Sequence, residues 1–447
     1  MLAAGLMLAS QATDVRAETL QEALASAYAE NPTLQARRAQ LRATDEGVPE
    51  ARSGWRPTVS ATGDAGVAET DSAVTPGGSE TQNPLTYGLS VQQPLYRGGR
   101  TVAAVSRAKN LVLAERQLLR SVEQDTLFAA ATTYMNVLRD TAVVELNVKT
   151  EQVLRRELDA TRDRAAVGDA TRTDVAQAEA RLAGAVAGRI QAVGNLETTR
   201  AEYRRVIGHP PQDLQRPPPA EGLPRSMDEA QRLAEEGNPD ILSAMYLERA
   251  AQDDVRLARG ELLPTLSLNG DIEHREDTVT SGTETDSASI IAQLSIPLYQ
   301  AGGPSARVRR AKQVANQRRL ELDEARRTVR DETTQSWEAL GTARARITQL
   351  ETQVRANQIA LDGTREQARV GSRILLDVLN AEQELLDAQV NLVSAVSEEL
   401  VAELRVLSAI GRLTARDLGL QVEYFDDEAY FNQVKGKFWG TGIGGSE

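Results

Sequence analysis

The stretch from Arg100 to Val167 contains neither glycine nor proline. Such a run predicts one continuous helix, because the residues that most readily end a helix are absent. At 1.5 Å per residue this helix would be about 100 Å long, far beyond the helices of an ordinary globular domain. Gly168 ends the run, and a second helical segment is expected at 173–207. The two segments together predict a long antiparallel helical hairpin.

The chain carries this arrangement twice. A second hairpin is expected with helices at 305–370 and 376–410, because five pairs of residues recur at one offset. The offset is 203 residues, and the pairs are Pro94 with Pro297, Tyr134 with Trp337, Gly168 with Gly371, Asp174 with Asp377, and Gly208 with Gly411. Solenoid repeats are much shorter, roughly 20–50 residues. The chain is therefore predicted to be a fused pair of half-proteins, 18–220 and 221–420, followed by a C-terminal tail, 421–447.

Ahead of each long hairpin the sequence alternates between apolar and polar residues, which is the pattern of a β-strand. Each half should therefore contain a β-hairpin, at about 58–96 and 265–299. The segments 69–83 and 277–287, rich in glycine, serine, threonine and aspartate, are expected to be loops. The strands have about ten residues each, close to the ~9–11 that cross a bilayer.

Proline and glycine mark the end of each β-hairpin. The strands are expected to stop at Pro94 and Pro297, because proline cannot donate to a strand ladder. Glycine pairs follow both prolines and allow unusual backbone turns, so they are expected to join strand to helix. These pairs are Gly98-Gly99 and Gly302-Gly303.

Two interpretations of the four strands remain open. They could form a small soluble sheet with one wet face, or they could be staves of a membrane barrel with an apolar outer face. Four strands cannot close a barrel, and unpaired strand edges are not tolerated in lipid. The barrel interpretation therefore requires an oligomer, and three copies would supply twelve strands. Its lipid-facing residues would be Leu89, Val91, Leu266, Leu268, Ile290, Ala292 and Leu294.

Composition excludes several function classes. A net charge of −13 disfavours nucleic acid or an anionic membrane surface as a partner. The chain has no cysteine and only two histidines, His209 and His274, so a thiolate or histidine metal site and a histidine-based catalytic site are not expected. No motif fixes an acid/base pair. The sequence thus predicts neither an enzyme nor a resident cofactor or metal.

The N-terminal 17 residues combine a short apolar run, 2–9, with small residues at positions 15 and 17. This pattern is expected of a signal-peptide remnant, although it lacks a basic segment; the alternative is a frayed soluble N-terminus. No later segment approaches the ~20 apolar residues of a membrane helix. Any membrane crossing would therefore have to come from strands.

The duplicated strand-to-helix joint, the VG turns at Gly168 and Gly371, and the phrases TDVAQAEARL and LDVLNAEQEL resemble the TolC family of outer-membrane channel proteins. The resemblance extends from about residue 18 to 440. The tail segment 422–441 is similar to the branch that serves type I secretion. The resemblance implies a homotrimer with a twelve-stranded barrel in outer-membrane lipid and a periplasmic α-barrel tunnel. It also implies a periplasmic adaptor (membrane fusion) protein and an inner-membrane transporter, expected to be of the ABC type, as partners.

The resemblance also implies a periplasmic gate at the two helical turns. Thr173 and Asp174 match positions that tether the inner coil to its neighbour, and Arg373 matches their basic partner. Asp377 matches an acidic ring in the constriction. Two positions depart from the family pattern. Asn380 stands where the family has a second acidic residue, and Ala368 stands where it has an aromatic gate residue. From the residues alone, the default interpretation is that Thr173 and Asp174 cap the returning helix.

The expected function is a passive exit duct for an unfolded polypeptide in type I secretion. A multidrug or metal efflux duct for small molecules is the alternative within the channel class. A soluble helical scaffold or adaptor is the alternative of another class, although it would leave the 203-residue duplication unexplained.

Overall fold

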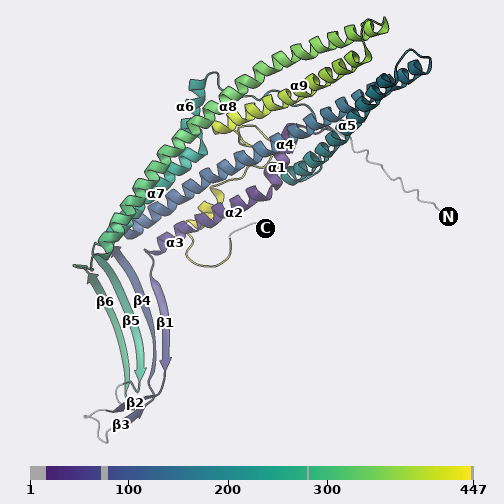
Figure 1. The fold of residues 1–447 in the computed structure, drawn as a ribbon. Helices are drawn as coiled ribbons and strands as arrows, with labels where there is room; N and C mark the ends of the chain where they lie inside the picture. Colours follow the sequence, from purple (N-terminus) through teal and green to yellow (C-terminus); the bar gives the residue numbers. More distant parts are fainter. Residues whose placement is uncertain (1–16, 72–78, 279–280, 444–447) are drawn as a thin grey trace, which may run out of the picture. The chain divides into compact units, whose positions relative to one another are not determined.

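The computed structural model describes residues 17–71, 79–278 and 281–443. Apart from Ala17, the predicted signal-peptide remnant lies outside the described residues. The chain is mainly helical with a small β part, as the sequence predicted (Figure 1). Among the described residues, no helix is both long enough and apolar enough to cross a membrane. The fold divides into two compact units, which we call the helical unit and the sheet unit.

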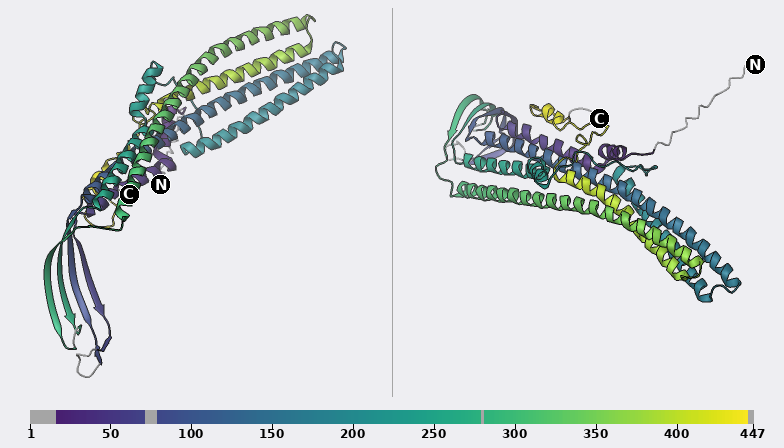
Figure 2. Two further views of the ribbon diagram at one scale, coloured as in Figure 1. Left: turned by 60° about the vertical axis from the view of Figure 1, so that its left-hand side comes forward. Right: turned by 90° about the horizontal axis from the view of Figure 1, so that it is seen from above.

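The helical unit comprises the chain up to Arg37 together with Leu119–Pro239 and Arg326–Phe425. The two longest helices, α4 and α8, run into it, and each is followed by a returning helix. Figures 1 and 2 show α4 beside α5 and α8 beside α9, which are the predicted helical hairpins. The helices are α1 (Leu20–Glu30), α4 (Arg100–Ala166), α5 (Arg172–Ile207), α6 (Met227–Gly237), α8 (Gly303–Arg369) and α9 (Leu375–Ala409).

Small side chains and ion pairs hold the long helices together. Ala130, Ala131 and Ala395 are fully buried, so neighbouring backbones can approach closely. Arg189 Nε of α5 lies 2.5 Å from Glu151 Oε2 of α4. An ion pair thus joins the two helices of the first hairpin, and small buried side chains lie on α4 and α9.

The sheet unit comprises Arg38–Leu118, Asp240–Ala325 and the chain from Asp426 onward. Its sheet is antiparallel, in the order β1-β4-β5-β6, and β2 and β3 form a separate ribbon. Within the described part of the chain, β1 and β6 are edge strands that pair on one side only. The strands are β1 (Thr58–Ala65), β2 (Ala68–Asp71), β3 (Ser79–Gln82), β4 (Leu85–Arg97), β5 (Thr265–Glu276) and β6 (Glu284–Ser295). The helices are α2 (Pro32–Asp45), which begins before this unit, α3 (Gly47–Ser53), α7 (Pro239–Gly260) and α10 (Ala429–Val434).

The strand register gives the sheet one apolar and one polar face. Ala61, Leu89 and Ile272 lie opposite one another across β1, β4 and β5, and Leu268 lies opposite Ala292. Because side chains alternate along a strand, all seven residues predicted to face outward share this face. The other face is polar: Asn269 Nδ2 donates to Gln293 Oε1 at 3.1 Å. Ile291, opposite Asn269, is an apolar exception on that polar face.

Pro94 does not end its strand, and this prediction was wrong. β4 continues to Arg97, with a register shift against β5 between Pro94 and Tyr96. A bulge of this kind accommodates proline, and β1 pairs with β4 only as far as Gln92. In the second half β6 ends at Ser295, before Pro297.

The strand-to-helix joints require glycine. Gly98 has φ +62° and Gly302 has φ +79°, a backbone region that disfavours side chains. A Cβ on Gly98 would also collide with the carbonyl oxygen of Gly260. Gly99 shares the positive φ, and Gly303 is the first residue of α8. The chain therefore turns from strand into helix within a few residues.

The segment 69–83 is not entirely a loop, in contrast to the prediction. β2 and β3 pair from Ala68 with Gln82 to Asp71 with Ser79. The partner of each of these short strands lies nearby in sequence, and composition alone does not reveal such a pairing. In the second half β6 already begins at Glu284, within the segment predicted as a loop.

Candidate functional site

The first helical turn joins α4 to α5. Gly168 has φ +83°, and Thr171 is the N-cap of α5. Asp174 completes a capping box: its carboxylate accepts the Thr171 N–H at 2.8 Å and the Thr171 hydroxyl at 2.7 Å. These hydrogen bonds hold the pKa of Asp174 below its ordinary value. Asp174 therefore stays ionised, while Thr173 lies exposed beside it.

The second turn joins α8 to α9 and differs from the first. Gly371 has φ +77°, but the N-cap of α9 is Ile374, which has no side-chain acceptor. Arg373 Nη1 lies 3.5 Å from Asp377 Oδ2, and Arg373 Nε donates to Gln367 Oε1 at 3.2 Å. Within one chain the structure thus brings Arg373 to Asp377, and not to Thr173 or Asp174.

The two positions that depart from the family pattern have local roles. Asn380 Oδ1 accepts from Arg181 Nη2 at 2.6 Å, which links α9 to α5. Ala368 packs against a buried cluster of Leu361, Val378 and Leu385. An amide and a small apolar side chain therefore join the two hairpins and fill the core near the turn.

Near each turn, an ion pair joins the two helices of the hairpin. The sequence analysis did not predict these two pairs. Arg162 Nη2 lies 2.7 Å from Glu179 Oε1 in the first hairpin, and Arg365 pairs with Glu382 in the second. Burial raises the pKa of Glu382, while Arg365 opposes that shift. The two pairs are separated by the same 203 residues as the other repeat positions. A search of the sequence for opposite charges that recur in both halves at that offset could have found them.

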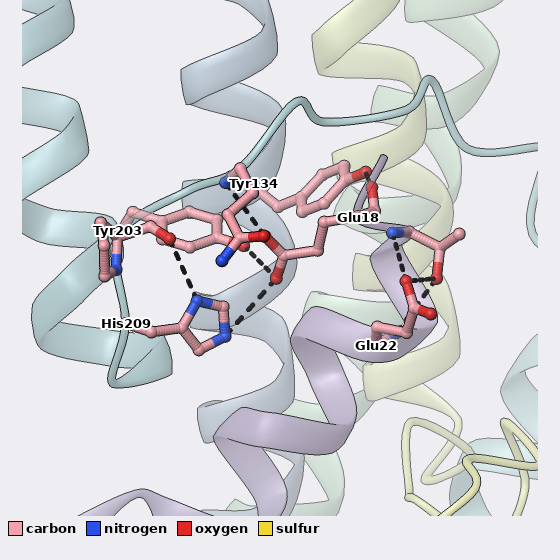
Figure 3. Close-up of polar contacts among 8 residues, drawn as sticks. Glu18, Glu22, Tyr134, Tyr203 and His209 are labelled. Carbon is pink, nitrogen blue, oxygen red and sulfur yellow. Dashed lines mark hydrogen bonds and ion pairs between the residues drawn. The ribbon is translucent and has the colours of Figure 1, made fainter. Parts of the chain in front are cut away.

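A buried polar cluster elsewhere in the helical unit was also missed (Figure 3). Glu18 forms a parallel bridge with Leu214, and its carboxylate accepts the Tyr203 hydroxyl at 2.7 Å. His209 Nε2 lies 3.5 Å from the same oxygen. The Tyr134 hydroxyl donates to the carbonyl oxygen of Glu18 at 2.8 Å. The cluster ties the segment before α1 to α4 and α5.

The two tyrosines of this cluster act as hydrogen-bond donors. Burial raises the pKa of Tyr203 and of Tyr134 well above the usual tyrosine value, so both hydroxyls remain protonated. We therefore interpret the cluster as a structural clasp, by which we mean that its hydrogen bonds hold the segment before α1 on α4 and α5. Among the described residues, no three histidine, cysteine, aspartate or glutamate side chains are grouped so that they could hold a metal ion.

We expect Tyr203→Phe to lower stability by about 1–3 kcal/mol, because it removes a hydroxyl that a buried carboxylate accepts from. The measurement is the thermal unfolding temperature of the purified protein. Tyr246→Phe, which removes a half-buried tyrosine hydroxyl outside the cluster, is the control and should change it little. Equal small effects of the two substitutions would contradict the role of the clasp.

Asp45, in the sheet unit, is a buried carboxyl group whose two oxygens have no hydrogen-bond partner among the described residues. Burial raises the pKa of Asp45 to about 6; the nearby Arg116 lowers it, and Asp427 and Glu46 raise it. The ionised form is thus disfavoured in the folded state. Because the folded pKa lies above the unfolded value, ionisation reduces stability as the pH rises through about 6.

We expect Asp45→Asn to stabilise the protein above pH 7, by up to about 3 kcal/mol, and to have little effect below pH 4. The measurement is the unfolding temperature as a function of pH. The parent protein should lose stability between about pH 4 and 7 relative to the variant. Parallel pH profiles of the two proteins would show that Asp45 is not the titrating group.

Known proteins share this fold and sequence pattern. The family model described as "Outer membrane efflux protein" matches residues 23–209 and 231–412. The "Outer membrane efflux protein BepC" of Brucella suis is 36% identical over 443 residues, covering 98% of this chain and 95% of that protein. The "Outer membrane protein TolC" of Vibrio cholerae is 26% identical over 420 residues and covers 92% and 94%.

A secretion protein and a solved channel also match. The "Alkaline protease secretion protein AprF" of Pseudomonas aeruginosa is 28% identical over 350 residues, covering 75% of this chain and 72% of that protein. The crystal structure of the CmeC outer membrane channel of Campylobacter jejuni superposes with a TM-score of 0.79 at 17% identity, covering 93% of this chain and 89% of that one. This structural likeness shows a common fold.

Proposed function

Because the chain belongs to the outer membrane efflux protein family, we propose that it forms the outer-membrane duct of a type I secretion system. It is an outer-membrane exit channel that extends into the periplasm, as the resemblance predicted. In the proposed system an ATP-binding inner-membrane transporter and a periplasmic adaptor deliver an unfolded polypeptide. The duct itself is passive and carries out no chemistry.

The observation that supports the channel part of the proposal is the four-stranded sheet, which has one apolar face and, in the described part of the chain, two edge strands that pair on one side only. Edge strands in lipid need partners for their backbone groups. In a homotrimer, β6 of each copy would pair with β1 of the next, and twelve strands would close a barrel. The face containing Leu89, Leu268 and Ile290 would then meet lipid, and the face containing Asn269 and Gln293 would line the lumen.

The helical hairpins supply the remainder of the proposed duct. Three copies of the two hairpins would surround a tunnel that continues the barrel lumen. The turns at Gly168 and Gly371 would narrow it at the periplasmic end. A transporter and adaptor would open the duct by binding the open arrangement more tightly than the closed one.

Protein secretion and small-molecule efflux are distinguishable by experiment. The name of AprF supports secretion, whereas the name of BepC supports efflux as a second candidate. If secretion is the main role, deletion of the gene should remove a polypeptide from the culture medium, and the intact gene should restore it. Increased antibiotic or metal sensitivity with an unchanged set of secreted proteins would favour the efflux alternative.

We expect Asp377→Ala to lower the preference of the channel for cations, because three copies of this carboxylate would ring the constriction. Arg373 Nη1 lies 3.5 Å from Asp377 Oδ2 and partly neutralises this carboxylate. Arg373→Ser should therefore increase the preference for cations. The measurement is the reversal potential of single channels in a salt gradient. If neither substitution moves it, the constriction lies elsewhere.

A further inference from the structure

The C-terminal tail from Asp426 onward packs against other parts of the sheet unit at several points. Arg116 Nη1 lies 2.8 Å from Glu428 Oε1, and the Tyr430 hydroxyl donates to Glu46 Oε1 at 2.7 Å. Phe431 packs against a buried cluster that contains Val48. Side chains of α3 and α4, and Glu46 just before α3, thus hold α10, and the residues after it start from a defined position.

After α10, two arginines that precede β1 bind the backbone of the tail. Arg52 Nη1 donates to the carbonyl oxygen of Lys435 at 2.5 Å, and Arg56 Nη1 to that of Lys437 at 2.8 Å. The Arg56 guanidinium also lies 4.0 Å from the centre of the Phe438 ring. Because Arg56 is two residues before β1, the aromatic end of the tail lies where the sheet begins.

This end of the tail exposes aromatic side chains beside positive charges. Phe438 is 71% exposed and Trp439 is 91% exposed. The charges belong to Arg52, Arg56, Lys435 and Lys437, none of which forms an ion pair with a carboxylate in the part of the chain that the structure describes. In a chain of net charge −13, this is a local basic and aromatic patch, which we call the tail patch.

The tail patch continues an exposed apolar surface at the same end of the sheet. Trp55 and Tyr96 are each 48% exposed and line one small pocket with Leu95 and Val102. Trp55 precedes β1 and Tyr96 lies near the end of β4, so the pocket marks the end of the sheet at which the long helix α4 starts. Aromatic residues at such a boundary are typical of the zone where lipid headgroups meet hydrocarbon.

We propose that the tail patch is a lipid-binding anchor that inserts Phe438 and Trp439 into the periplasmic-facing leaflet of the outer membrane. The inference rests on the proposed function, in which the strands cross that membrane. The four cations would contact lipid phosphates while the two rings lie at the headgroup boundary. The tail patch thereby couples the C-terminal segment, held on α3 and α4, to the membrane surface.

The chain contains three tryptophans, Trp55, Trp337 and Trp439, which makes the test direct. Trp55→Phe with Trp337→Phe leaves Trp439 as the sole fluorophore. The full-length variant is reconstituted in vesicles of phosphatidylethanolamine and phosphatidylglycerol, with or without bromine near the headgroup end of the acyl chains. We expect short-wavelength emission that brominated lipid quenches and that aqueous iodide does not.

Two variants control the experiment. In Trp55→Phe with Trp439→Phe, the remaining Trp337 lies on α8 in the helical unit and should not respond to brominated lipid. A variant with Ile290→Trp as its sole tryptophan places a fluorophore on the apolar face of β6 and should be quenched. All variants are first checked for the same oligomeric state as the parent.

Three outcomes would overturn the inference. If Ile290→Trp is quenched and Trp439 is not, the strands meet lipid but the tail patch does not, and the proposed function stands. If neither is quenched, the membrane crossing by the strands fails as well. If Trp439 emits at short wavelength but is insensitive to brominated lipid, a protein surface covers the tail patch instead of lipid.

Discussion

Leu268→Arg should destabilise the membrane-inserted protein, by at most the ~2–4 kcal/mol that arginine costs at the bilayer midplane, whereas Asn269→Arg should cost far less. The two residues are adjacent in β5 but lie on opposite faces of the sheet. Leu268 shares its face with Ala292, and Asn269 is hydrogen-bonded to Gln293 on the other. A charge on the first face would lie in hydrocarbon, and a charge on the second would lie in water.

The measurement is the urea dependence of unfolding for both variants in lipid vesicles, together with the fraction of each chain recovered in the outer membrane. Ile290→Arg and Gln293→Arg repeat the comparison on β6 and exclude a peculiarity of β5. Equal tolerance of arginine on both faces would contradict a membrane barrel and would favour the small soluble sheet.

Arg373→Ser combined with Asp174→Ala should raise the resting conductance of the reconstituted channel. In the proposed trimer, Arg373 of one copy would bind Thr173 and Asp174 of its neighbour and hold the periplasmic turns together. A partly exposed ion pair of this kind is worth only about 0–1 kcal/mol. Three symmetric copies could together contribute a few kcal/mol, which is enough to keep a two-state gate mostly closed.

The local contacts of these residues determine the control. Asp174 also accepts hydrogen bonds from Thr171, so its removal weakens the cap of α5 as well as the proposed gate. Thr171→Ala weakens the same cap but keeps both charges, and it should leave the conductance low. If Thr171→Ala opens the channel as much as the double variant, loosening of the turn is responsible. If the double variant conducts no better than the parent, the gate lies elsewhere.

The fold was predictable because its main signals are long and repeated. The glycine-free and proline-free run at 100–167 and the 203-residue offset specified two helical hairpins. Alternation placed Leu89, Leu268 and Ile290 on one face, as the register confirms. The prediction that the strand ends at Pro94 was wrong, because a bulge accommodates this proline within β4. The effect of a bulge depends on the partner strand, which lies far away in sequence.

The candidate site was less predictable, because equivalent positions in the two halves have different partners. Asp174 and Asp377 share the 203-residue offset, yet one completes a helix cap and the other pairs with Arg373. The difference arises because Thr171 provides a hydroxyl at the first N-cap and Ile374 does not at the second. The Glu18 cluster was missed for a related reason: Tyr203 and His209 meet Glu18 only after α4 and α5 have packed.

In the proposed assembly, three copies of this chain form one outer-membrane channel. The most direct test is the mass of the protein extracted in mild detergent from isolated outer membranes, measured by native mass spectrometry. We expect a species of three chains that remains assembled in detergent. A monomer, or recovery of the chain in the soluble periplasmic fraction, would contradict it.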